Sequence, residues 1–524
     1  MKKELNADVV ILGGSLGGVA AALASAGAGK KVILTEDTYW IGGQLTNQAV
    51  PPDEHPWIEQ FGCTASYRKL RNGIRNYYKD NFPVTEKARS SINLNPGNGW
   101  VGKLCHEPRA ALAVINDMLA PYIHSGRLTI LTRHKLTSAE TSDDRIISVS
   151  VRNLNNGNEY ILTAPYFLDA TECGDLLPLS GTEYVTGSES SAETGELHAL
   201  PGKADPLDMQ AVTWCFAMDY IEGEDHTIEK PKDYDFWKNY QADFWPIKHL
   251  SWEILQPATL AVRDTVLFPY EDKTSLWTYR QIIDKNNFLP GTFQSSITLV
   301  NWPQNDYWLG PIFDVSEEEA KRHLEGARQV SLSLLYWMQT EAPRADGKAG
   351  YPGLRLRPDV VGTEDGLAMQ PYIRESRRIK AEFTILEQHV GAEMRKGKPA
   401  EEFKDTIGIG SYRIDLHPST GNRNYVDISS MPFQIPLGSL IPVRTKNLLA
   451  ACKNIGTTHI TNGCYRLHPV EWNIGEAAGY AAAYCIDNNI SPKELRNTDK
   501  HLTAFQRILE KQGVELHWPE FTAQ

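Results

Sequence analysis

The sequence lacks the features that would place this protein in a membrane, on a nucleic acid or in a disulfide-bonded fold. No apolar run approaches the roughly 20 residues of a membrane-spanning helix. The 53 lysines and arginines are outnumbered by 65 aspartates and glutamates, giving a net charge of −12. There is no basic run, which argues against a nucleic-acid surface. The seven cysteines are scattered, odd in number and without a C-x-x-C pair. That pattern predicts free thiols in a cytoplasmic protein and no metal site.

What remains is the composition of an ordinary globular protein, 41% hydrophobic and 23% charged over 524 residues. This length predicts two to four domains. Thirteen tryptophans and 22 tyrosines are an unusual aromatic content, and many lie between residues 214 and 308. We expect most of these to pack in a core, with two or three lining a cleft.

Residues 8–36, "DVVILGGSLGGVAAALASAGAGKKVILTE", predict a strand, a tight turn, a small-residue helix and a second strand. Gly13, Ser15 and Gly18 fall on the G-x-G-x-x-G frame of a dinucleotide cradle. In that fold the first glycine permits the turn, the third lets the helix approach the strand, and the helix N-terminus binds a pyrophosphate. Ser15 replaces the middle glycine, and its hydroxyl could bond the phosphate. Glu36 lies where an acid binds the adenosine ribose.

A secretory leader is the alternative interpretation of the same segment. Lys2 and Lys3 would be its basic start, and Ala24-Ser25-Ala26 resembles a cleavage site. Glu4 and Asp8 place acid in the basic region, and four glycines would weaken the leader's helix. The second strand, which ends at Glu36, is also unexplained by a leader, so we favour the cradle.

A strand, a glycine turn and an alanine-rich helix reappear near the C-terminus, in "NLLAACKNIG" and "GEAAGYAAAYCIDN". This return predicts an α/β protein with a discontinuous Rossmann-like FAD-binding domain, residues 1–187 and 432–524. An inserted α+β substrate domain, residues 188–431, is expected between them. Helices are predicted over 66–80, 106–124, 316–340 and 371–396, and the alanine-rich helix is expected to begin near Gly475.

These stretches, with "GGQLTNQAVPPDEH", "FLDATECGDLLPLSG" and "PYIRESRRI", resemble the FAD-dependent oxidoreductase family of glutathione-reductase-like topology. More narrowly, the chain is similar to a bacterial subgroup that also carries xanthan-lyase-like labels. The resemblance covers nearly the whole chain. Two departures are Ser15 for glycine and Glu172 in "ATECGD", where A-T-G is frequent; Glu172 is expected to alter the local turn.

The resemblance implies that FAD binds the first motif, with Gly42-Gly43 beside the pyrophosphate and Ala170-Thr171 facing the adenosine half. The final motif would lie against the flavin. Together with the cradle analysis, the predicted cofactor-binding residues are Gly13, Gly14, Ser15, Gly17, Gly18, Glu36, Gly42, Gly43, Gln44, Arg109, Ala170, Thr171, Gly475, Ala477 and Ala478.

Four residues are predicted to take part in catalysis: His459, His468, Tyr465 and Arg374. Imidazole titrates in the range needed to accept a proton from an alcohol, although either histidine could instead bridge buried backbone groups. Arg374 and Arg377, three apart on a predicted helix, would share a face. Arg374 could grip a polar substrate there, or join a surface network with Glu375. The spacing of Tyr412, Asp415 and His417 could turn His417 toward the same cleft, but an exposed edge strand explains it equally well.

The leading hypothesis is a non-covalent FAD oxidoreductase that takes hydride from a small polar, hydroxyl-bearing and sugar-like molecule. A flavin-dependent reductase of an unsaturated bond and a non-catalytic flavin-binding module are the alternatives. A small-molecule substrate is expected, and no nucleic-acid or membrane partner. The sequence does not define the electron acceptor, the substrate or the oligomeric state.

Overall fold

The computed structural model describes residues 2–519 and contains a central five-stranded parallel sheet. Its strand order is β24-β8-β2-β3-β4, so the last strand of the chain lies beside an early one. Leu448 pairs with Phe167, and Val9 pairs with both Val32 and Tyr166. The bounds of these strands are Val9–Leu12 (β2), Val32–Glu36 (β3), Leu128–Thr132 (β4), Tyr166–Asp169 (β8) and Leu448–Ala450 (β24). The C-terminal segment therefore completes the N-terminal sheet, as expected, while boundaries at 187 and 432 stay a prediction.

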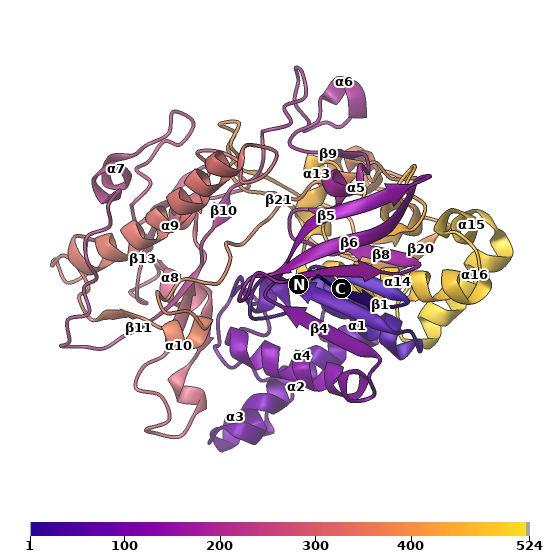
Figure 1. Cartoon of the computed structure of the whole chain (residues 1–524). Helices are drawn as coiled ribbons and strands as arrows, with labels where there is room; N and C mark the ends of the chain where they lie inside the picture. Colours follow the sequence, from indigo (N-terminus) through magenta and orange to yellow (C-terminus); the bar gives the residue numbers. More distant parts are fainter. Residues whose placement is uncertain (1, 520–524) are drawn as a thin grey trace.

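The first helix after the sheet's central strand is α1, Leu16–Gly27, and it packs against α14, His468–Asn488. A Cβ on Gly475 would lie 1.9 Å from the Gly17 carbonyl oxygen, and one on Gly479 would lie 2.5 Å from that of Ala21. Only glycine allows backbones to approach this closely. Figure 1 shows the result: the indigo N-terminal elements and the yellow C-terminal helices occupy one lobe.

The predicted start of the alanine-rich helix near Gly475 is wrong, because this helix, α14, begins at His468 with Pro469 in its first turn. Gly475 lies inside the helix, and Ala477 and Ala478 are fully buried within it. Their small side chains are therefore explained by helix packing, and their contact with a cofactor stays a prediction.

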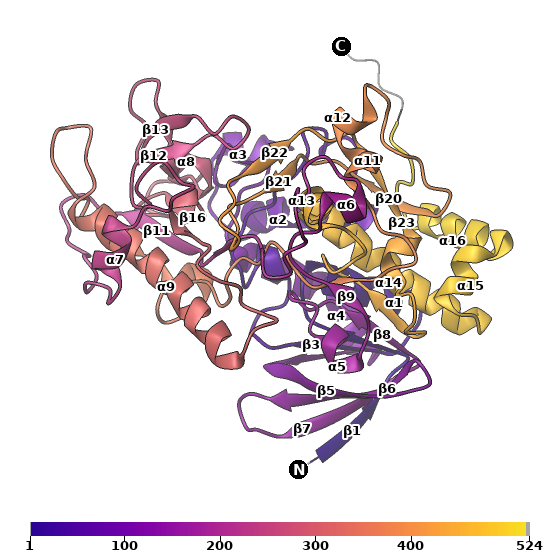
Figure 2. The ribbon, with the colours of Figure 1, turned by 90° about the horizontal axis from the view of Figure 1, so that it is seen from above.

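A second sheet, of order β1-β7-β6-β5, projects from the same lobe, as Figure 2 shows. Its strands are Lys2–Asn6 (β1), His134–Ser142 (β5), Arg145–Asn153 (β6) and Glu159–Thr163 (β7). Strands β6 and β7 form an antiparallel hairpin that leads into β8.

The other lobe contains the middle of the chain around a sheet of order β15-β16-β11-β18. The long helix α9, Glu317–Thr340, lies in this lobe beside the shorter α7. Most tryptophans here are core residues, as expected: Trp237, Trp245, Trp302 and Trp308 are all buried. The strands of this lobe are Val212–Thr213 (β10), Phe216–Tyr220 (β11), Glu253–Leu255 (β12), Val262–Val266 (β13), Thr274–Ser275 (β14), Gln281–Ile283 (β15), Ile297–Val300 (β16), Asp306–Tyr307 (β17) and Leu354–Leu356 (β18).

Three other predicted helices agree closely with α2, α4 and α9, but the helix predicted over 371–396 is wrong. Residues 371–377 have no regular structure, and β19, Arg378–Ile379, pairs with β9, Tyr184–Val185. Within the range 371–396 the only helices are two single turns, α11 (Glu387–Val390) and α12 (Ala392–Arg395). The helical spacing of Arg374 and Arg377 is overridden because their side chains pair with carboxylates in different places: Arg374 with the buried Asp306, and Arg377 with Asp175 and Asp314.

The remaining helices are Ala65–Asn81 (α2), Glu86–Ser90 (α3), Pro108–His124 (α4), Leu176–Ser180 (α5), Ser191–Thr194 (α6), Tyr234–Asn239 (α7), Leu276–Tyr279 (α8), Pro358–Val361 (α10), Glu387–Val390 (α11), Ala392–Arg395 (α12), His459–Tyr465 (α13), Pro492–Asn497 (α15) and Asp499–Lys511 (α16). The remaining strands are Thr406–Gly410 (β20), Ile414–Leu416 (β21), Val426–Ile428 (β22) and Phe433–Pro436 (β23). Within residues 2–519, no helix combines the length and apolarity that crossing a bilayer requires.

Candidate functional site

A cavity of about 680 Å³ opens at the carboxyl ends of β2, β3 and β8. In open parallel sheets this edge is where ligands bind. Five of the predicted cofactor residues line the cavity: Gly13, Ser15, Glu36, Ala170 and Thr171. Residues from the middle of the chain line it as well: Trp214, Met369, Gln370, Pro371 and Ile373.

The turn after β2 is shaped by Gly13, whose φ of +94° is a conformation that side chains disfavour. A Cβ on Gly13 would lie 2.3 Å from the Ala170 carbonyl oxygen. Gly43 folds over the start of α1, where its Cβ would lie 3.0 Å from the Leu16 nitrogen. The two glycines therefore bring three chain segments within van der Waals distance of the helix N-terminus.

Ser15 is the N-cap of α1, and its Oγ accepts a hydrogen bond from the Gly18 nitrogen at 3.1 Å. The sequence suggested that this hydroxyl would bond a phosphate, whereas the structure uses its oxygen to cap the helix. Serine is among the favoured N-cap residues, which explains why it can replace glycine in this frame. Gly18, whose Cβ would lie 2.1 Å from the Gly13 carbonyl oxygen, has the packing role expected of it.

Glu36, at the end of β3, lies on the cavity wall. Its carboxylate accepts hydrogen bonds from the Gly14 nitrogen at 3.0 Å and from the Thr38 nitrogen at 2.8 Å. Burial, and then the charge of Asp37, raise the pKa of Glu36 above its usual value. The side chain is thereby fixed beside the turn, where the fold places a ribose-binding acid.

Two further carboxylates lie at the start of α1. Glu471 accepts from the Gly17 nitrogen at 3.0 Å, and it also accepts from the Gln44 side chain. Glu172 lines the cavity and forms an ion pair with Lys453. Burial raises the pKa of Glu172 even though Lys453 opposes this. The Glu172 Oε1 atom is buried without a hydrogen-bond partner among the described residues.

Two predicted residues lie away from this cavity. Arg109 donates to the Asp359 carbonyl oxygen and stacks 5.3 Å from the Trp40 ring, in a separate surface hollow. Tyr465 donates its hydroxyl to the Gln434 carbonyl oxygen at 2.8 Å and stacks on Phe433. Both were expected at the site, but the structure gives Arg109 a surface role and Tyr465 a core role.

A second cluster of charged and aromatic groups surrounds Arg280. Arg280 pairs with Asp53 at 3.3 Å, and Arg466 pairs with Asp415 at 3.2 Å. Although burial lowers the pKa of Arg280, the adjacent Asp53 raises it well above its usual value. Arg466 also donates to the Tyr372 hydroxyl at 2.9 Å.

Half-buried side chains form the outer part of this cluster, while Asp53, Arg280 and Arg466 are buried at its base. The Tyr279 ring packs against the exposed Trp100 in a tilted arrangement, with ring centroids 4.6 Å apart. Hereafter "the arginine cluster" means these residues together: Asp53, Tyr279, Arg280, Tyr372, Tyr412, Asp415 and Arg466.

His468 joins the arginine cluster through Asp53, whose backbone N–H donates to His468 Nδ1 at 3.0 Å. Burial lowers the pKa of His468 to about 4, so the ring is neutral near pH 7. Because Nδ1 accepts this bond, Nε2 carries the hydrogen of the neutral ring. The His468 ring thus carries its hydrogen on Nε2 and also lies beside the Val50 backbone, so it does not present the proton acceptor that the sequence suggested.

Arg374 and Arg377 do not share a face. Arg374 is paired with Asp306 at 3.1 Å and donates to the Thr213 hydroxyl at 2.8 Å. Arg377 instead pairs with Asp175 and Asp314. The Arg374 guanidinium is therefore engaged by the protein itself, and its predicted grip on a substrate stays untested.

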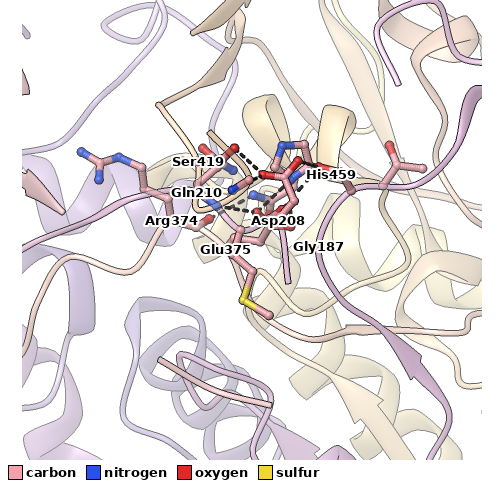
Figure 3. Close-up of polar contacts among 12 residues, drawn as sticks. Gly187, Asp208, Gln210, Arg374, Glu375, Ser419 and His459 are labelled. Atoms are coloured by element: carbon pink, nitrogen blue, oxygen red, sulfur yellow. Dashed lines mark hydrogen bonds and ion pairs between the residues drawn. The ribbon is translucent and has the colours of Figure 1, made fainter. Parts of the chain in front are cut away.

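His459 begins α13 inside a buried polar network. Its Nδ1 faces Glu375 at 2.9 Å, and Glu375 also pairs with Arg378. Figure 3 shows Glu375 pointing toward His459, with Gln210 and Asp208 beside them. Only 3% of the His459 surface is exposed.

The sequence singled out the cradle but not the arginine cluster. Asp53, Arg280 and Asp415 come from segments that share no motif, and only the tertiary fold brings them together. Two partial signals were available: the spacing of Tyr412, Asp415 and His417, and the excess of aromatic residues, which includes Tyr279 and Tyr372.

With this geometry established, the fold and cavity are those of a dinucleotide-binding protein. A family model described as FAD dependent oxidoreductase matches residues 8–509. The chain belongs to this family, and FAD is its cofactor. It has no match among curated protein sequences.

Solved structures with a similar fold are distant. The p-nitrophenol 4-monooxygenase PnpA from Pseudomonas putida is 13% identical with a TM-score of 0.36, covering 98% of this chain and 87% of that chain. The myxobacterial chondrochloren halogenase CndH is 12% identical with a TM-score of 0.33, covering 97% and 80%. A glycerol-3-phosphate dehydrogenase from Bacillus halodurans complexed with FAD is 11% identical with a TM-score of 0.25, and the alignment covers 41% of this chain and 40% of that chain. The chain spans only 26% to 41% of the first three structures that it matches.

The residues around the cavity fit FAD. The volume lies in the range of small-molecule sites, and the glycine cradle leaves the backbone of the turn accessible. The Glu172 carboxylate, held beside the Gln48 side-chain amide and Lys453, adds a polar group to the cavity wall next to the turn.

Gly13→Ala is expected to weaken FAD binding at least 100-fold. The new Cβ would overlap the Ala170 carbonyl oxygen at 2.3 Å and force the turn open. Gly29→Ala is the matched control, because Gly29 has a φ of +85° but nothing within 4 Å of its Cβ position. The measurement is titration of the apoprotein with FAD, followed by flavin fluorescence. Equal losses in the two variants would attribute the effect to backbone strain instead of the cradle.

Proposed function

We propose that this FAD-dependent oxidoreductase oxidises a small polar, hydroxyl-bearing substrate of sugar-like chemistry. The observation that carries this proposal is the arginine cluster. It combines carboxylates that accept hydrogen bonds from hydroxyls, guanidinium groups that donate to oxygens, and aromatic rings that stack on flat polyhydroxylated faces. Two arginines are offset by two aspartates, which suits a neutral polyol better than an anion.

FAD, when bound, accepts the hydride. The residues proposed to hold it are Glu36 at the adenosine ribose, and the Ser15 and Leu16 backbone nitrogens at the pyrophosphate. Ala170 and Thr171 would form the wall of the adenosine half. His468 would donate its Nε2 hydrogen to an oxygen of the ligands.

We further propose that residues 188–431 form the substrate domain and that the chain belongs to the bacterial subgroup with glutathione-reductase-like topology. A cytoplasmic location is supported by the cysteines: all seven are free, and six are buried. Free thiols are typical of reducing compartments.

The test is anaerobic mixing of the holoenzyme with glycerol, xylitol, D-sorbitol, D-glucose and D-gluconate, with the flavin absorbance recorded. At least one of these compounds is expected to bleach the flavin, and gluconate is expected to be slower than the neutral polyols. Bleaching by NADH or NADPH alone, with no response to any hydroxylated compound, would contradict the proposal and favour a reductase.

A further inference from the structure

We infer that His417, oriented by Asp306, is the base that takes the hydroxyl proton of the substrate. This inference rests on the proposed oxidation of a hydroxyl group, and it assigns the proton acceptor that neither His459 nor His468 supplies. Three observations support it: the geometry of the pair, its place beside the arginine cluster, and the state of the other two histidines.

The pair has the geometry of an oriented base. His417 Nδ1 lies 2.5 Å from the Asp306 carboxylate, which is fully buried. Burial alone would raise the pKa of Asp306, but the charge of Arg374 is the first of the effects that oppose this, and hydrogen bonds from His417 and Thr213 add to it, so the pKa falls to about 2. Asp306 is therefore ionised and can only accept, so Nδ1 donates. The neutral ring then has its free lone pair on Nε2.

Nε2 points toward the arginine cluster. It lies 3.9 Å from an Asp415 oxygen, and Asp415 is the partner of Arg466. The His417 side chain is 20% exposed, in contrast to the buried His459 and His468. A carboxylate on each side of the ring offsets the charge that forms when Nε2 accepts a proton.

The proton balance is simple. Oxidation of an alcohol to a carbonyl breaks one C–H and one O–H bond and removes two electrons. The hydride acceptor would be bound FAD, and the hydroxyl proton passes to His417 Nε2. The resulting imidazolium releases its proton to solvent through its exposed edge. Asp306 stays ionised throughout and is a positioning residue.

The first experiment uses no substrate. Holoenzyme is treated with diethyl pyrocarbonate, which modifies unprotonated imidazole nitrogens, and the sites are mapped by peptide mass spectrometry. His417 is expected to react, and His459 and His468 to react at least tenfold more slowly. An unreactive His417 would overturn the proposal, because its Nε2 would not be an accessible acceptor.

The second experiment follows flavin bleaching by the five hydroxylated compounds named above. His417→Gln keeps a polar side chain beside Asp306 but cannot take a proton, so the rate should fall at least 100-fold, the range of general-base catalysis. FAD content should be unchanged. His417→Ala should regain rate on addition of imidazole, which a structural role would not produce. His501→Gln, on the surface helix α16, is the control with unchanged rate.

The outcomes separate the two proposals. A wild-type rate in His417→Gln overturns the base while leaving the oxidation of a hydroxyl intact. If none of the five compounds bleaches the wild-type flavin, the proposed substrate class fails. The diethyl pyrocarbonate result then decides whether His417 is an accessible acceptor or not.

Discussion

Gly475→Ala is expected to lower the free energy of unfolding by about 3 kcal/mol, at the upper end for overpacking, and to weaken FAD binding. Its Cβ would lie 1.9 Å from the carbonyl oxygen and 2.5 Å from the carbonyl carbon of Gly17. These are backbone atoms of the helix that follows the cradle, so no side chain can rotate away. Helices α1 and α14 must separate, and Ser15 and Gly17 move with α1. Urea denaturation followed by tryptophan fluorescence, with FAD titration, measures both effects.

The control for this substitution is Gly27→Ala, at the other end of α1. There the new Cβ would meet only the Tyr122 hydroxyl, at 3.3 Å, which can shift. Alanine also favours a helix by up to about 1 kcal/mol over glycine, so this variant should be neutral or slightly more stable. If Gly475→Ala were as stable as Gly27→Ala, the close contact of the two helices would be wrong.

Arg280→Met is expected to lower the free energy of unfolding by about 3–5 kcal/mol, because it leaves one partner of a buried ion pair without its counter-charge. Asp53 is buried, and Arg280 is its ion-pair partner. Although burial raises the pKa of Asp53, Arg280 and then His468 bring it below its usual value. Without the guanidinium the carboxylate must stay charged in a poorly solvated place or take up a proton.

A double-mutant cycle isolates this pair. Asp53→Asn with Arg280→Met removes both charges at similar volume, and it should recover most of the stability that Arg280→Met loses. Denaturation of the four proteins at pH 7 gives the coupling energy. Additive losses of stability would show that the two side chains act independently. The rate of flavin bleaching by the polyols in the same variants would measure how much Asp53 and Arg280 contribute to the substrate site.

Local patterns predicted the cradle because a dinucleotide turn is encoded within about 30 adjacent residues. Gly13, Gly18 and Glu36 each have a position set by neighbours in the chain. The return of the chain was also visible, because the strand before Cys452 and the alanine-rich helix carry their own patterns. What these patterns did not give was the helix boundary at His468, since the first turn, "HPVE", looks like the end of a loop.

The environments of the side chains predicted to be catalytic were harder to foresee, because their partners lie far away in the sequence. His459 and His468 stood out because they lie close together in the sequence, near the alanine-rich helix α14. Their burial and hydrogen bonds, however, follow from Glu375 and Asp53, which no local rule connects to them. The spacing of the arginines in "PYIRESRRI" gave a wrong helix prediction for the same reason. Arg374 pairs with Asp306, and Arg378 pairs with Glu189 and Glu375. The backbone is therefore extended where the spacing predicted a helix.

The pairing of β24 with β8 has a consequence for biosynthesis. On the ribosome the cradle emerges well before the strand beside β8 and the helix that covers α1, because β24 and α14 follow it much later in the chain. Until then the apolar side of α1 and one edge of β8 are exposed. At about 5–20 residues per second this interval lasts tens of seconds. The nascent protein must therefore keep these surfaces protected from aggregation until β24 and α14 have been made.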